Sequence, residues 1–143
     1  MARWVFLAAV IVLLVLTLGC SRGSAAGFRL PAGDPHAGGV AFAELQCASC
    51  HRVEGTDLPA PHTVPAVLLG GQVPVPPTDG ELTTDVINPS AHFALGYPQD
   101  QIMVAGHSRM PDYTHRMSVR QMADIVAFLH TRYEVAPLPR PMK

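Results

Sequence analysis

The stretch Cys47-Ala48-Ser49-Cys50-His51 decides the fold of this 143-residue chain. Two thiols separated by two residues can add to the two vinyl groups on one edge of a porphyrin. The residue after the second thiol then lies beneath the central iron, where the neutral imidazole of His51 supplies a nitrogen ligand. This spacing is the signature of a c-type haem attachment site. We therefore expect one covalent haem c, bound through Cys47 and Cys50, with His51 as an axial iron ligand.

Three other uses of a Cys-x-x-Cys pair are possible here. A thioredoxin-like redox pair follows a strand in a βαβ unit, whereas a helical pattern precedes Cys47. A structural zinc site needs two further ligands, for which the chain offers His36 and His62 but no second cysteine pair. A disulfide between Cys47 and Cys50 is the simplest alternative. The haem interpretation is favoured because it uses all five positions of the motif.

An iron that only exchanges electrons needs a sixth ligand that stays bound in both oxidation states. Met110 lies in an irregular loop between predicted helices, and Pro111 biases it away from helical geometry. A thioether ligand favours ferrous iron and so raises the reduction potential. We therefore expect Met110 to be the second axial ligand. The competing candidates are Met103, expected to pack, Met117 and Met122, expected in or beside the last helix, and four histidines, of which His107 and His115 lead.

The segment before the motif is predicted to be helical, and the segment after it is predicted to be a loop. Asp34 followed by Pro35 is an N-cap with proline at the first helical position, which predicts a helix over 35–46 that leads into Cys47. Prolines recur through residues 52–78. A loop of this length in a compact domain usually serves function or encloses a ligand.

Two capping boxes mark further helices. The Thr-x-x-Glu pattern over 78–81 predicts a short helix over 81–87, and a second short helix is expected over 98–105. The Ser-x-x-Gln pattern over 118–121 begins the clearest helix, whose apolar residues recur at helical spacing as far as Tyr133. Because no run of alternating strands occurs, the sequence predicts an all-α fold.

The N-terminus carries a targeting pattern. Residues 4–18 form an unbroken apolar run behind Arg3, shorter than the roughly 20 residues of a membrane-spanning helix, which predicts an export signal. Residues 16–20 resemble a bacterial lipobox, in which Cys20 becomes the first mature residue and carries lipid. The alternatives are an ordinary signal cleaved nearby and an uncleaved anchor. We expect a signal peptide over 1–19, a tether over 20–33, a folded domain over 34–135 and a proline-rich tail over 136–143.

Charge and cysteine content limit the classes of partner. Removing residues 1–19 removes one of 10 basic residues and none of the 11 acidic ones, so the mature net charge is 9 − 11 = −2. Nucleic acid is therefore not an expected partner. Export permits disulfides, but lipid on Cys20 and haem on the other two cysteines would leave none of the three unused.

Residues 35–133 resemble the class I c-type cytochromes. The shared features are the helix that enters the Cys-x-x-Cys-His motif, the later Met-Pro pair and the last helix. The resemblance implies a small cytochrome c fold wrapped around one haem, in which the first and last helices cross with a glycine against an aromatic ring. It puts Gly39 at the glycine position and Phe128 at the aromatic position, and it leaves Phe42 one residue from the usual spacing.

The resemblance also implies two further residues beside the haem. The carbonyl of Pro65 is expected to accept a hydrogen bond from the free ring nitrogen of His51, which would fix the tautomer and strengthen the ligand. Pro59 and Pro61 compete for this position. Tyr97 is expected within reach of a haem propionate, and the alternative is a partly buried aromatic ring beside a proline.

These features predict one-electron transfer without substrate chemistry, in a respiratory chain on the periplasmic or extracytoplasmic side. The expected partners are redox proteins and, through lipid or an N-terminal anchor, a membrane; no small-molecule substrate is expected. One alternative is the same haem domain docked permanently in a larger oxidoreductase complex. The other is a sensor or peroxidase with an open iron site.

Overall fold

The computed structural model describes residues 29–137 of the chain. The predicted signal peptide, the predicted lipidation site Cys20, the first part of the tether and the end of the tail lie outside the described residues. Within 29–137, no helix is long and apolar enough to cross a membrane.

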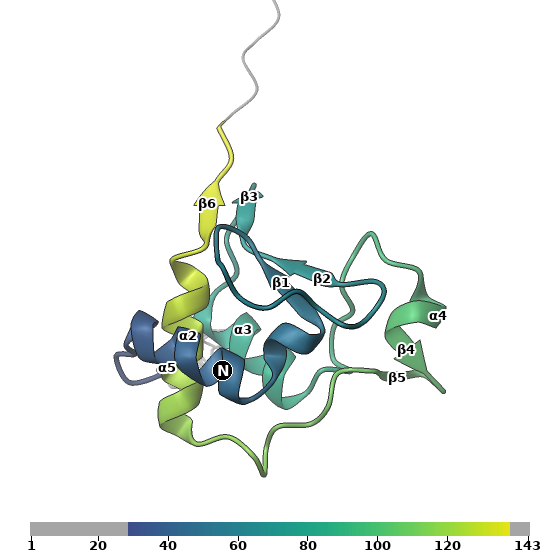
Figure 1. Cartoon of the computed structure of the whole chain (residues 1–143), viewed down its shortest axis with the longest axis horizontal. Coiled ribbons are helices and arrows are strands. Elements are labelled where there is room, and N and C mark those ends of the chain that lie inside the picture. The colour runs from purple at the N-terminus through teal and green to yellow at the C-terminus, as the bar shows by residue number, and fades with distance from the viewer. Residues whose placement is uncertain (1–28, 138–143) are drawn as a thin grey trace, which may run out of the picture.

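Helices α2 (Pro35–Glu44) and α5 (Val119–His130) pack against each other and form the frame of the molecule (Figure 1). The predicted start of α2 is confirmed, since the Asp34 carboxylate accepts the N–H of His36 at 2.8 Å. The helix ends at Glu44, two residues before the predicted end, and Leu45 caps it. These two helices carry most of the buried apolar side chains, which are Ala41, Phe42, Met122, Ile125, Val126, Phe128 and Leu129.

The backbones of α2 and α5 come closest at Gly38, whereas Gly39, the position that the resemblance implied, faces the Phe128 ring. A Cβ at Gly38 would lie 2.7 Å from the Cβ of Phe128 and closer still to the carbonyl of Asp124. A Cβ at Gly39 would lie 3.5 Å from the Phe128 ring, which is ordinary contact. Gly38 and Phe42 are four residues apart and share one helix face, so the Phe42 and Phe128 rings meet at 5.8 Å between centroids.

The chain before α2 is fastened to α5. The buried Asp124 carboxylate accepts the backbone N–H of Asp34 at 2.8 Å, and the Arg120 guanidinium donates to the carbonyl of Ala32 at 2.8 Å. Gly33 lies so close to the α5 backbone that a Cβ there would overlap Ala123. The last residues of the predicted tether are therefore held by the folded domain.

Both predicted capping boxes are formed. Helix α3 (Asp79–Ile87) begins where the Thr78 hydroxyl accepts the N–H of Glu81, and the Glu81 carboxylate accepts the N–H of Thr78 at 2.7 Å. At the start of α5 the Ser118 hydroxyl accepts the N–H of Gln121 at 3.1 Å. Local sequence chemistry therefore places both helix starts, although α3 begins two residues before the predicted position.

The helix predicted over 98–105 is largely wrong. Helix α4 (Gln99–Ile102) makes a single turn, after which β4 (Met103–Val104) pairs antiparallel with β5 (His107–Ser108). Ala105 and Gly106 both have positive φ angles, +52° and +83°, as a two-residue type I′ hairpin requires. The hairpin and α4 lie on the opposite side of the molecule from α2 and α5 (Figure 1).

The segment 52–78 is mostly irregular, as predicted, but contains three short strands. Strand β1 (His51–Val53) pairs parallel with β2 (Val67–Leu69), and β3 (Gly71–Val73) pairs parallel with β6 (Tyr133–Val135). Three-residue strands are too short for the alternation that reveals a strand in sequence. With so little sheet beside the helices, the predicted all-α fold is confirmed.

Candidate functional site

The Cys-x-x-Cys-His motif forms a tight turn between α2 and β1. Gln46 is left-handed, with φ of +60°, and the 3₁₀ helix η2 (Cys47–Ser49) follows it. The Ser49 hydroxyl donates to the carbonyl of Gln46 at 2.7 Å, and the N–H of Cys50 donates to the carbonyl of Cys47 at 3.2 Å. Cys50 lines a cavity, whereas Cys47 packs against the core. Burial raises the pKa of the Cys47 thiol to about 11, so this thiol is protonated at neutral pH.

His51 follows the turn as the first residue of β1. Its ring lies 6.4 Å from the Phe42 ring between centroids, so the side chain is held by α2. Desolvation by burial lowers the pKa of this imidazole below its ordinary value. The ring is therefore neutral at neutral pH and keeps a nitrogen lone pair for a metal. Its Nδ1 atom is buried and makes no hydrogen bond to any residue in the range 29–137.

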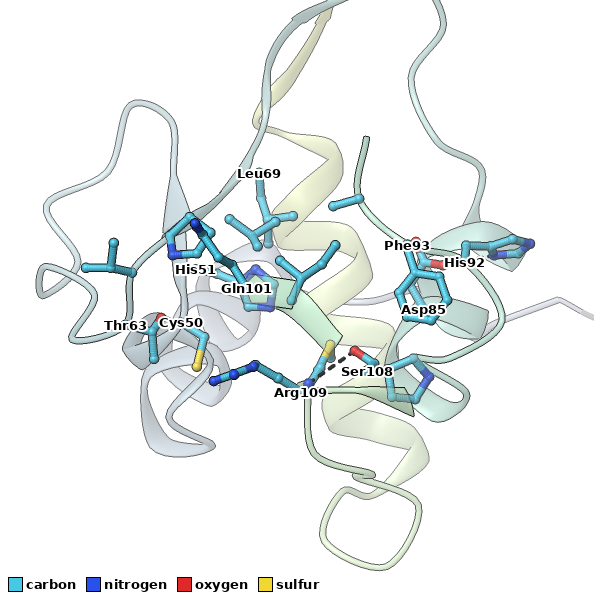
Figure 2. A pocket seen from close by; sticks show the side chains of 17 residues that line it. Cys50, His51, Thr63, Leu69, Asp85, His92, Phe93, Gln101, Ser108 and Arg109 are labelled. Carbon is cyan, nitrogen blue, oxygen red and sulfur yellow. Dashed lines mark hydrogen bonds and ion pairs between the residues drawn. The ribbon is translucent and has the colours of Figure 1, made fainter. Parts of the chain in front are cut away.

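Met110 lines the same cavity as Cys50 and His51, although it is distant from both of them in the sequence. The cavity has a volume of about 280 Å³ and a predominantly apolar wall that includes Val67, Leu69 and other aliphatic side chains. Figure 2 shows Cys50 and Thr63 on one side of it and Phe93 and Asp85 on the other, with His51 and Gln101 between them. The fold thus brings a thiol, a neutral imidazole and a thioether to one enclosed space.

These side chains fit a covalently attached haem, whose second thiol would come from Cys47 in the adjoining turn, and comparison with known proteins agrees. The sequence model of the cytochrome c family, described as cytochrome c, matches residues 36–132. The chain belongs to the cytochrome c family. No curated protein and no solved structure gave a significant match. Members of this family bind haem c covalently and transfer electrons through it, so the haem expected from the motif fits the family.

The residues of this cytochrome also fit haem c better than the alternative uses of its cysteines. Cys47 and Cys50 are free thiols rather than a disulfide. In the described part of the chain no three His, Cys, Asp or Glu side chains come together in a way that could hold a metal ion. The parallel strands β1 and β2 are joined by a loop without a helix, so the βαβ context of a thioredoxin-like pair is missing.

Most of the rival sixth ligands lie away from the cavity. Met122 is buried in α5, Met117 packs against the core, and Met103 is in β4. His107 and His115 are exposed and do not line the cavity. His92 does line it, and the contact of its Nδ1 with the Asp85 carboxylate at 3.2 Å leaves its Nε2 free. Of the predicted sixth ligands, Met110 and His92 are therefore the two that line the cavity.

The two residues that the resemblance added have different outcomes in the cytochrome. Pro65 lines the cavity, but its expected hydrogen bond with His51 is absent, because Nδ1 of His51 has no hydrogen-bond partner within residues 29–137. The Tyr97 hydroxyl accepts the backbone N–H of Leu68 at 2.9 Å, and Tyr97 is not among the residues that line the cavity. Tyr97 thus fastens the loop before α4 to β2.

Sequence reasoning missed several polar side chains around the cavity. Asp85, Gln101 and Arg109 all line it, and Arg109 is its one Lys or Arg side chain among the described residues. In Figure 2 the Arg109 side chain extends toward the side of the cavity that holds Cys50. The proximity of Arg109 to Met110 in sequence was the one available signal, since Asp85 and Gln101 reach the cavity only through folding.

Tyr113 is a second kind of missed residue, because it supports the site without lining the cavity. Its ring is buried, and its hydroxyl donates a hydrogen bond to the carbonyl of Leu45 at 3.1 Å. Leu45 is the C-cap of α2, two residues before Cys47. The bond therefore ties the segment after Met110 to the segment that carries the attachment cysteines.

Proposed function

We propose that this cytochrome carries one haem c and transfers single electrons in an exported respiratory chain. The observation that supports this most is that Cys50, His51 and Met110 line one cavity. The sequence contains a single Cys-x-x-Cys-His motif, in agreement with one haem. When bound, haem c supplies an iron that alternates between the ferric and ferrous states.

In this proposal each residue has a defined role. The thiols of Cys47 and Cys50 form thioethers to the porphyrin edge. The neutral imidazole of His51 and the thioether of Met110 would hold the iron. With both residues bound, the protein would rearrange little on a change of oxidation state, and the iron would have no place for a substrate. The soft sulfur of Met110 favours the ferrous state and raises the reduction potential.

The cellular setting follows from the N-terminal sequence. The predicted export signal and Cys20 support a lipid-anchored domain on the periplasmic side of a membrane. Each buried methylene of a lipid chain contributes about 0.8 kcal/mol to membrane binding, and a tether raises the effective concentration near membrane partners. The partners in this proposal are redox proteins that bind transiently, through interfaces below about 1,200 Å². Stoichiometric co-purification with other subunits would instead support a permanently docked haem subunit.

The decisive experiment is the optical spectrum of the oxidised holoprotein before and after Met110→Ala. Ligation by Met110 predicts a weak far-red band from sulfur to ferric iron that disappears in the variant. Met103→Ala is the matched control, because Met103 lies in β4 outside the cavity, and it should keep the band. A wild-type spectrum without this band, or one that Met110→Ala leaves unchanged, would contradict the proposal and favour a different sixth ligand or an open site.

A further inference from the structure

Two serines, Ser108 and Ser90, hold the backbone of Met110 through two successive hydrogen bonds, which we call the relay. The hydroxyl of Ser108 accepts the N–H of Met110 at 3.1 Å, and the N–H of Ser108 donates to the hydroxyl of Ser90 at 3.0 Å. The dashed line at Ser108 in Figure 2 marks the first of these bonds. Ser90 follows Pro89, a cavity-lining residue beyond the end of α3. The relay therefore connects Met110 to the segment of the cavity wall that follows α3.

The Ser108 hydroxyl is the one partner that the Met110 N–H has among residues 29–137. Strand β5 ends at Ser108, and the last backbone bond of the hairpin region joins the N–H of Arg109 to the carbonyl of Ile102 at 2.9 Å. Pro111 has no N–H and adds no bond on the other side. The bond from Met110 to Ser108 is partly buried. Without the hydroxyl, this N–H would lose its partner in a place that water reaches poorly.

The geometry points to Ser108 as a positioning residue that holds the Met110 thioether on the iron. This inference rests on the proposed function, in which Met110 is an axial ligand. The hydroxyl stabilises the bound position of Met110 selectively, because a released loop can satisfy the same N–H with water. A net hydrogen bond of ordinary strength corresponds to about a five- to tenfold change in the equilibrium between bound and released Met110.

The test is the affinity of imidazole for the ferric iron of the holoprotein, measured by optical titration. Imidazole binds only where Met110 has been released, so its apparent dissociation constant reports that equilibrium. Ser108→Ala should bind imidazole about five- to tenfold more tightly than wild type. Ser108→Thr keeps the accepting oxygen and should restore the wild-type value. Ser90→Ala removes the second bond of the relay and should shift the affinity in the same direction as Ser108→Ala, by less.

Ser118→Ala is the matched control for a loss of stability alone. The Ser118 hydroxyl also accepts a backbone N–H at 3.1 Å, from Gln121, but it caps α5 and does not line the cavity. Ser118→Ala and Ser108→Ala should both lower the melting temperature, but of these two variants only Ser108→Ala should change imidazole affinity. Equal affinities in the two variants would overturn the role of Ser108. If Met110→Ala itself leaves imidazole affinity at the wild-type value, Met110 is not a ligand, and the proposed function fails with it.

Discussion

Gly38 is the residue of α2 at which the helices α2 and α5 come closest. Its missing side chain lets the backbone of α5 approach at Asp124, and the Phe128 Cβ fills the space beside it. Gly39 is adjacent in sequence but faces only the edge of the Phe128 ring. Two neighbouring glycines in one helix thus have different structural roles, because successive residues in a helix point in different directions.

At this scale we predict opposite effects for two alanine substitutions. Gly38→Ala should lower the free energy of unfolding by about 3 kcal/mol, because the new methyl group would meet backbone that cannot move aside. Gly39→Ala should raise it by up to about 1 kcal/mol, since alanine favours the helix and its methyl group fits. Chemical denaturation of the two holoproteins measures both values. Equal destabilisation by the two substitutions would show that the crossing is not at Gly38.

At the scale of secondary-structure elements, the β4–β5 hairpin positions the Met110 loop. Its register pairs Met103 with Ser108, so the strand ends at the residue whose hydroxyl accepts the Met110 N–H. The turn contains Ala105 with φ of +52°, a left-handed conformation that costs an L-residue about 1–2 kcal/mol. The tertiary structure therefore imposes a backbone on Ala105 that its side chain disfavours.

Two substitutions in this turn should consequently change stability in opposite directions. Ala105→Asn should raise the free energy of unfolding by about 0.5–1 kcal/mol, because Asn-Gly is a preferred type I′ sequence. Gly106→Ala should lower it by about 1 kcal/mol, because Gly106 needs φ of +83°. Thermal unfolding of the holoprotein followed by circular dichroism tests both. A loss of stability with Ala105→Asn would mean that the turn is of another type.

At the scale of the whole molecule, the cavity separates two unequal parts. The helices α2, α3 and α5 share one apolar core, to which Leu82 of α3 contributes. The segments that form the rest of the cavity wall, 63–69, 89–94 and 101–110, hold none of the buried residues and meet one another across the cavity. The haem is therefore expected to supply the missing packing surface for this second part.

Removal of both attachment thiols should unfold much of the domain. The double variant Cys47→Ala, Cys50→Ala is expected to lose haem and most of its helical circular dichroism, because the few buried side chains that α2, α3 and α5 share cannot keep so small a domain folded without the haem. Cys20→Ser is the control, since it should keep the haem spectrum and the helical signal while reducing membrane attachment. A double variant that stays folded and cooperative without haem would contradict this prediction.

The features determined by the sequence alone are those with local causes. The spacing of Cys47, Cys50 and His51 predicts haem attachment. The hydroxyls of Thr78 and Ser118 cap helices by accepting the backbone N–H three residues further along the chain. The prediction that Met110 is an iron ligand also rested only on its loop and on the proline after it, and the optical spectrum of the Met110→Ala variant tests it. Local rules suffice for the haem-attachment motif and the two helix caps because each of these interacting groups lies within a few residues of its partner.

The tertiary structure decided the features that depend on distant partners. It selected Gly38 over Gly39 at the helix crossing, and it turned the predicted helix at Met103 into a hairpin strand. It also placed Ser108 so that its hydroxyl accepts the Met110 N–H and its own N–H donates to the Ser90 hydroxyl. No local pattern encodes these outcomes, because each depends on which segment packs alongside. The sequence thus determined the chemistry of the site, and the packing of distant segments decided how that chemistry is held.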